Sequence, residues 1–275
     1  MAIRTDYHLH THHSGDCEAP MEEVICSAID KGLSEICFTE HLDLNYPETE
    51  ETHADTFKLD GDAYHREFQS LYNKYSDRIS LRFGLECGMQ TANHAENGKF
   101  ICKYDFDLVL GSVHLLYGDD PYPYSFFSDH PERSEKQAFA DYLESTFQMI
   151  REFDDFDVLA HMDYLIRYCI GLDRCYEYSD YKASIDAILN ELIRREKGLE
   201  VNTAGIRRGM EQTNPTFPVI ARYRELGGRL ISVGSDAHLP EDLGADFDKA
   251  EAFLRKAGFT EYSVYHKRKP VFLPL

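Results

Sequence analysis

The chain has 275 residues, a length that suits one large domain or two small ones. It carries 29 Lys and Arg against 49 Asp and Glu, which gives a formal net charge of −20. This excess opposes any broad basic face that follows a nucleic-acid backbone, and it disfavours docking on anionic membranes. Hydrophobic residues make up 43% of the chain, which is ample for a packed core and excludes wholesale disorder.

No stretch approaches about eighteen consecutive apolar residues, so we expect no segment to span a bilayer. Residues 1–6 lack the apolar region of a secretory signal. The seven cysteines are an odd number, are scattered and include no C-x-x-C pair, so we expect reduced thiols rather than a disulfide framework. The expected compartment is the cytoplasm.

Short apolar runs alternate along the chain with amphipathic segments. The runs that predict strands lie at 3–9, 36–39, 81–85, 108–110, 158–160, 199–201 and 230–233. Helical spacing begins at Pro20 and ends at Gly32, and it recurs over 64–75, 139–150, 185–193, 219–226 and 247–257. Ser134 and Gln137 have the spacing of a capping box ahead of the third of these helices.

Strands that alternate with helices predict parallel βα units, which form either an open doubly wound sheet or a closed barrel. Seven units without a dividing linker favour an α/β fold with a (β/α) barrel. We expect one domain over residues 1–275 and ligands at the C-terminal ends of the strands.

Imidazoles and carboxylates follow almost every predicted strand. In an extended strand, residues i and i+2 point to the same face, so His8 and His10 can reach one ion. Asp236 and His238 repeat this spacing after the last strand. The predicted metal ligands are His8, His10, Asp16, His41, Glu86, His114, His161, Asp236 and His238.

Each of these features alone has an ordinary explanation, because single histidines are often structural and single acids often cap helices. Their joint placement at successive strand ends is much harder to explain as chance. Six imidazoles and three carboxylates exceed the three or four protein ligands of one catalytic Zn²⁺. Two or three divalent ions that share carboxylates fit better, and the ligand types permit Zn²⁺, Mn²⁺ or Fe²⁺.

The same motifs resemble the PHP (polymerase and histidinol phosphatase) superfamily over essentially the whole chain. The segments HLHTHHSGD, FTEHLD, GLECG, GSVHLL and AHMDYLIRY are most similar to its stand-alone histidinol-phosphatase branch. This resemblance implies a distorted seven-stranded (β/α) barrel with a trinuclear metal site at the C-terminal strand ends.

The resemblance also implies how three ions share the ligands. Many members of the superfamily have a histidine where Asp16 stands, so the third site can differ in metal preference or affinity. The first ion would take His8, His10, Glu86 and Asp236, the second Glu86, His114 and His161, and the third Asp16, His41 and His238.

The implied activity is the metal-dependent hydrolysis of L-histidinol phosphate to L-histidinol and phosphate in histidine biosynthesis. The ions would supply the nucleophile as a bridging hydroxide, because bound water can be acidified to a pKa near about 7. Three divalent ions would also make a locally positive pocket in an acidic protein. The residues expected to be catalytic are Glu86, Asp236, His238 and Arg167.

Arginines suit the phosphate, because a guanidinium makes bidentate contacts with its oxygens. We expect Arg167, Arg207 and Asn202 to bind substrate, with Arg208 as the alternative to Arg207 and surface ion pairs as the other explanation. Glu40 and Asp163 are expected to orient His41 and His161.

Two long segments, 43–60 and 117–133, are predicted to wall the substrate, and their acids could bind its ammonium group; the alternative is a solvated surface. The other histidines, His12 and His13 among them, are expected at the surface or behind the ligands. The basic run 267–269 is expected to be a solvated end.

Two alternative functions stay open. The first is another PHP phosphoesterase, acting on nucleotides or oligonucleotide ends. Processive hydrolysis of DNA would require a basic groove, which the composition does not indicate. A non-catalytic metal-binding scaffold would be expected to have lost several ligands, and none is missing here. We therefore expect a small phosphorylated substrate and neither nucleic acid nor membrane as partner, with the oligomeric state left open.

Overall fold

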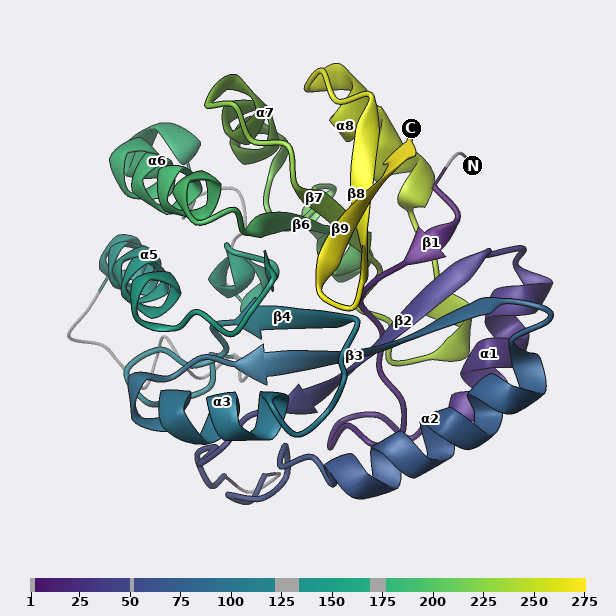
Figure 1. Ribbon diagram of the computed structural model, residues 1–275. Coiled ribbons are helices and arrows are strands. Elements are labelled where there is room, and N and C mark those ends of the chain that lie inside the picture. Colours follow the sequence, from purple (N-terminus) through teal and green to yellow (C-terminus); the bar gives the residue numbers. More distant parts are fainter. Residues whose placement is uncertain (1–2, 50–51, 122–133, 169–176) are drawn as a thin grey trace.

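The computed structural model describes residues 3–49, 52–121, 134–168 and 177–275. Seven parallel strands lie in chain order in one sheet that curls into a barrel (Figure 1). The predicted barrel is confirmed, and its strands are β1 (Thr5–Asp6), β2 (Glu35–Leu42), β3 (Ser80–Gly88), β4 (Leu108–Ser112), β5 (Val158–Leu159), β6 (Gly198–Asn202) and β7 (Ile231–Gly234).

The barrel closes where the first strand meets the last. The backbone N–H of Tyr7 donates to the carbonyl of Val233 at 3.1 Å, and that of Asp236 donates to the carbonyl of His8 at 2.7 Å. The regular strand predicted over 3–9 is much shorter in the structure, because the chain after Asp6 pairs irregularly. With β1 and β5 only two residues long, the barrel is distorted.

Helices surround the barrel on its outer side (Figure 1). The predicted amphipathic segments are helical, whereas α3, with only Asn97 and Ile101 buried, has too little apolar periodicity to have been predicted. Among the described residues, no helix is long and apolar enough to cross a membrane. The helices are α1 (Met21–Asp30), α2 (Gly61–Tyr75), α3 (His94–Ile101), α5 (Glu135–Glu152), α6 (Tyr178–Arg194), α7 (Phe217–Glu225) and α8 (Phe247–Lys256).

The helices begin and end at the predicted capping residues, with one difference. Gly32 has φ +74° directly after α1, a conformation that glycine adopts readily. The Ser134 hydroxyl accepts the N–H of Gln137 at 3.2 Å and caps α5. The reciprocal half of the capping box is replaced, because the Gln137 side chain donates to Asp141 at 2.8 Å.

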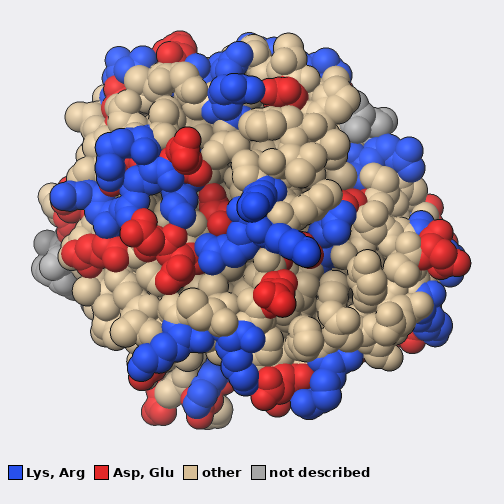
Figure 2. Space-filling model, viewed as in Figure 1, with Lys and Arg blue, Asp and Glu red and all other residues tan. Residues whose placement is uncertain are grey.

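A C-terminal hairpin, β8 (Glu261–His266) and β9 (Lys269–Pro274), covers the N-terminal end of the barrel. Ser263 donates to the carbonyl of Ile231 at 2.9 Å, and Arg268 lies 2.9 Å from Asp157. The run 267–269, expected as a solvated end, is therefore the tight turn of this hairpin. Figure 2 shows that acidic and basic side chains are interspersed on this face of the molecule.

The helical layer should contribute to stability independently of the strand ends. Leu189 on α6 is fully buried, so Leu189→Ala should lower the free energy of unfolding by about 2–5 kcal/mol through lost burial and a cavity. The exposed Lys182 on the same helix offers a control, and Lys182→Ala should change it by less than about 0.5 kcal/mol. Urea unfolding measures both, and equal values would contradict this packing.

Candidate active site

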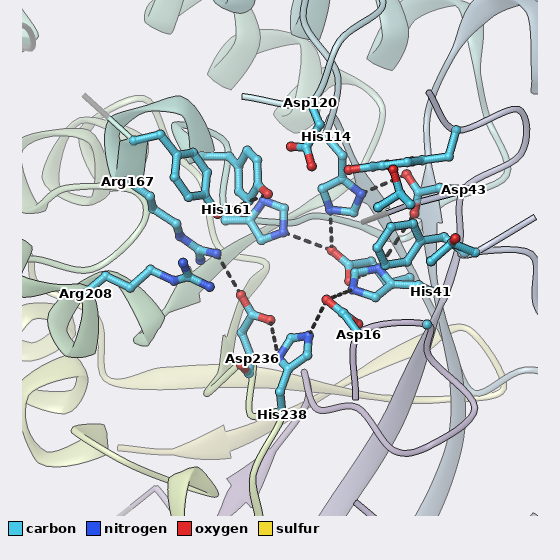
Figure 3. A pocket seen from close by; sticks show the side chains of 18 residues that line it. Asp16, His41, Asp43, His114, Asp120, His161, Arg167, Arg208, Asp236 and His238 are labelled. Carbon is cyan, nitrogen blue, oxygen red and sulfur yellow. Dashed lines mark hydrogen bonds and ion pairs between the residues drawn. The ribbon is translucent and has the colours of Figure 1, made fainter. Parts of the chain in front are cut away.

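A cavity of about 430 Å³ opens beside the C-terminal ends of the strands. Figure 3 shows that its labelled imidazoles and carboxylates point toward one another from segments far apart in the sequence. Seven of the nine predicted ligands line the cavity, and His8 and His10 lie buried behind them. The structure thus brings together all nine side chains that the strand ends predicted.

The Glu86 carboxylate, on β3, lies at the centre of this cluster. Its Oε2 atom lies 3.1 Å from His8 Nε2, 3.3 Å from His10 Nε2 and 3.1 Å from His41 Nδ1. Three imidazoles from two strand ends therefore converge on one buried oxygen.

The second oxygen of Glu86 has its own pair of imidazoles. Its Oε1 atom lies 3.1 Å from His114 Nε2 and 2.9 Å from His161 Nε2, and it accepts the Ser112 hydroxyl at 2.6 Å. One carboxylate is thus shared among five imidazoles in all.

The remaining acids extend the cluster toward the cavity mouth. Asp236 Oδ1 lies 3.5 Å from His10 Nε2, and Asp16 Oδ2 lies 3.1 Å from His238 Nε2 and 3.7 Å from His41 Nε2. Four sets of three residues within this region have ligand atoms close enough to hold one ion: His8, His10 and Asp236; His8, Glu86 and His161; His41, Glu86 and His114; and His10, His41 and His238.

Several buried polar atoms in this cluster have no hydrogen-bond partner. They include His8 Nε2, His10 Nε2, His41 Nδ1 and Glu86 Oε2, which lie close to one another. Leaving such atoms unpaired costs about 1–3 kcal/mol each, whereas a divalent cation would satisfy them together. The residues present therefore fit a metal centre.

Two of the residues have charges that agree with that fit, whereas the neighbouring carboxylates outweigh burial and raise the pKa of His8, His114 and His238. Burial alone would raise the pKa of Glu86, but the imidazoles of His8, His41 and His114 outweigh it and hold the pKa well below its usual range. Burial, together with His41 and His238, lowers the pKa of His10 to about 3. An ionised carboxylate and a neutral imidazole are the forms that bind metal.

Glu200, which sequence reasoning missed, orients two of these imidazoles from β6. Its Oε1 lies 2.7 Å from His8 Nδ1, and its Oε2 accepts the backbone N–H of His161 at 2.9 Å. The first bond leaves His8 Nε2 facing Glu86. The second helps to hold His161 at a strained φ of 23°. A charged residue two positions before Asn202 on an apolar strand was the available signal.

Asp43, also missed, plays the corresponding part for His114. Its Oδ1 lies 2.9 Å from His114 Nδ1, which directs Nε2 at Glu86. Asp43 is buried at the cavity wall, one residue beyond the end of β2. Its position after a strand is the signal that identified the other acids.

Of the two predicted orienting acids, Glu40 acts on His41 through Ser14, whereas Asp163 contacts other partners. Glu40 accepts the Ser14 hydroxyl at 2.6 Å. Ser14 Oγ in turn lies 3.1 Å from His10 Nδ1 and accepts the backbone N–H of His41 at 3.0 Å, so Glu40 supports both histidines through Ser14. Asp163 accepts a hydrogen bond from the Asn214 side chain at 2.7 Å, and Asn214 in turn accepts one from Arg167, so Asp163 supports Arg167.

Arg167, in the short helix η2 (Tyr164–Tyr168), lines the cavity and is buried. It donates through Nη1 to Asp236 Oδ2, through Nη2 to Asn202 Oδ1 and through Nε to Asn214 Oδ1, each at 2.9 Å. Asn202 lies beneath Arg167 rather than on the cavity wall. The guanidinium is therefore held rigidly beside a predicted metal ligand.

The structure places Arg208, rather than Arg207, on the cavity wall. Both lie in the short helical segment η3 (Ile206–Met210). Arg207 turns away and donates to the carbonyl of Ser235 at 2.7 Å, which supports the backbone next to Asp236. Sequence spacing alone did not separate the two neighbours.

The outer part of the cavity is aromatic and acidic. The segment 43–60 supplies Tyr46 and Phe57, whose ring centroids are 4.5 Å apart, and η2 supplies Tyr164 and Tyr168. Asp120 comes from the second predicted wall, 117–133, of which residues 122–133 lie outside the described residues. The described parts of both segments thus contribute to the wall.

Comparison with known proteins agrees with this arrangement. The sequence model of the PHP domain family matches residues 6–204. This chain belongs to the PHP family. The PHP chain is 37% identical to a probable histidinol-phosphatase of Clostridium acetobutylicum over 246 residues, which cover 89% of this chain and 90% of the relative. It is 30% identical to the histidinol-phosphatase of Lactococcus lactis, covering 97% and 96%.

A solved PHP structure also matches the whole fold. The crystal structure of histidinol phosphate phosphatase from Lactococcus lactis, complexed with zinc, L-histidinol and phosphate, superimposes with a TM-score of 0.87 at 28% identity. The match covers 98% of this chain and 99% of that one. The fold is therefore shared, and the zinc of that structure together with the donor groups of this chain supports divalent metal ions as cofactors.

The role of Glu200 gives a test of the site. Glu200→Gln keeps the shape but weakens the bond to His8, so metal affinity should fall by about 10–100-fold while the fold is kept. Activity should be measured while metal is titrated into the protein. The variant should need a higher metal concentration than the wild type to reach full activity. The exposed Glu96→Gln, on α3, is the control and should bind metal normally. Unchanged affinity in Glu200→Gln would refute the orienting role.

Proposed function

We propose that residues 1–275 form a single PHP phosphoesterase domain that hydrolyses L-histidinol phosphate to L-histidinol and phosphate, the reaction expected in histidine biosynthesis. The observation that carries this proposal is the Glu86 carboxylate shared among five imidazoles at the base of a cavity with two arginines on its wall. The names of the PHP relatives and the ligands of the Lactococcus lactis structure support the same substrate.

The nine predicted ligands, from His8 to His238, would hold two to three divalent ions. The chemistry that such ions supply is neutralisation of phosphate oxygens and acidification of a water to a pKa near about 7. The identity of the metal is left to measurement, because imidazole and carboxylate ligands suit Zn²⁺, Mn²⁺ and Fe²⁺.

The chain's own residues would position the phosphate. Arg167 presents its remaining guanidinium hydrogens beside Asp236, and three protein acceptors fix its plane. Arg208 lies over the Tyr168 ring at 5.7 Å on the same wall. Phosphoryl transfer through a loose transition state depends mainly on such positioning and charge stabilisation, so no Ser nucleophile is required.

The outer wall suits the rest of the substrate. Tyr46, Phe57 and Tyr164 offer aromatic faces to an imidazole ring, and Asp120 offers a carboxylate to an ammonium group. This polar and aromatic lining favours a small amino alcohol phosphate over a long polyanion. The preference agrees with the net charge of −20.

We also propose that the enzyme works in the cytoplasm. The five cysteines within the described residues (17, 26, 37, 87 and 102) are free thiols. Free thiols persist in a reducing compartment, where a biosynthetic enzyme of amino-acid metabolism would act.

The direct test is a substrate panel with purified, metal-loaded protein. The kcat/KM for L-histidinol phosphate should exceed that for nucleoside monophosphates and p-nitrophenyl phosphate by at least about 100-fold, because the wall groups recognise the amine and imidazole. A chelator should abolish turnover and added divalent metal should restore it. Comparable turnover on every ester, or faster turnover on oligonucleotide ends, would sink the assignment.

A further inference from the structure

A second cluster of imidazoles and a carboxylate lies outside the cavity. His12 Nε2 and His13 Nε2 lie 3.2 and 2.9 Å from the same oxygen, Glu67 Oε2, on α2. All three ligand atoms lie within 4.8 Å of one another. None of these residues lines the active-site cavity, so the cluster is separate from the nine predicted ligands.

The backbone and rings hold the two imidazoles in place. The N–H of His12 donates to the carbonyl of Ala19 at 2.9 Å, and Thr11 just before it donates through its N–H and hydroxyl to Glu40. The ring centroids of His12 and His13 are 4.4 Å apart, and that of His13 is 5.4 Å from Tyr64. The site is therefore largely organised before any ligand binds.

The spacing and exposure of the three side chains suit an ion from solvent. Two ligands about 2.1 Å from a tetrahedral ion lie about 3.4 Å apart, close to the distances between each imidazole nitrogen and Glu67. The side chains of His12 and Glu67 are 40% and 34% exposed, which leaves an entry path and room for water as a further ligand.

We propose that His12, His13 and Glu67 form a peripheral transition-metal site that binds Zn²⁺ and fastens the segment 11–16 to helix α2. Two imidazoles and one carboxylate suit Zn²⁺ and its neighbours, whereas Mg²⁺ and Ca²⁺ prefer oxygen ligands alone. The segment 11–16 carries Ser14, which lies 3.1 Å from His10 Nδ1, and the predicted ligand Asp16. An ion bound by His12, His13 and Glu67 would therefore hold the segment 11–16 in place beside the catalytic centre. This site is additional to the metal site of the proposed phosphatase.

The test counts zinc ions in the zinc-loaded holoenzyme. After gel filtration, elemental analysis and a calorimetric titration with ZnCl₂ should together find one more Zn²⁺ per chain in the wild type than in Glu67→Gln or His13→Gln. Affinity at this site should fall by about 100-fold or more in either variant, since even a lost orienting group costs about 10–100-fold. Titration with MgCl₂ should give no binding at this site.

Two matched variants control for the loss of any surface acid or imidazole. Glu96 and His53 are exposed and lie outside the cluster, so Glu96→Gln and His53→Gln should keep the additional zinc. Because ions are counted rather than turnover, the result is independent of the substrate assignment. The same number of zinc ions per chain in the wild type and in both cluster variants would overturn the proposal. The three side chains would then form an ion pair without a metal.

Discussion

The crowding of five imidazoles around the single carboxylate of Glu86 is the constraint on which the rest of the structure depends. Glu86 is fully buried, and its Oε2 has three imidazole nitrogens within 3.3 Å. Protons alone satisfy this arrangement poorly, because several of the buried nitrogens are left without partners. Divalent cations resolve the conflict, since each can accept imidazole and carboxylate ligands at once.

The barrel makes this crowding possible. Parallel strands end at one rim, so side chains from β3, the end of β2 and the segments after β1, β4, β5 and β7 meet without long connections. Backbone at the rim is strained in places: His161 has φ 23° and Asp236 has φ 54°. Strain of this kind costs about 1–3 kcal/mol per residue and persists only where surrounding bonds determine it.

Buried carboxylates behind the cluster supply those bonds. Asp6, on β1, accepts the N–H and hydroxyl of Ser235 at 2.9 and 2.6 Å and the N–H of Gly244 at 3.0 Å, which fixes the turn before Asp236. Glu40 and Glu200 do the same for His10 and His8 through their own contacts. Close packing adds to this, because a Cβ on Gly234 would lie 2.3 Å from His8 Cβ. The acids behind the cluster thus determine how precisely the predicted metal ligands converge.

Strand periodicity and the residues that end each strand were enough to predict the barrel and the convergence of the nine side chains. They worked because parallel topology alone fixes which ends meet. The supporting contacts were harder to predict. Glu40 reaches both His10 and His41 only because the Ser14 turn places one hydroxyl between them, and whether Arg207 or Arg208 faces the cavity depends on the local helical phase. The hairpin β8–β9 was missed because its short basic turn is typical of an exposed end.

The most direct measurement is anomalous X-ray diffraction from crystals of the active, zinc-loaded protein at the zinc absorption edge. The account predicts anomalous peaks about 2.0–2.2 Å from both carboxylate oxygens of Glu86, with imidazole nitrogens completing each coordination shell. A fully active crystal form with no metal at coordination distance from Glu86 would contradict it.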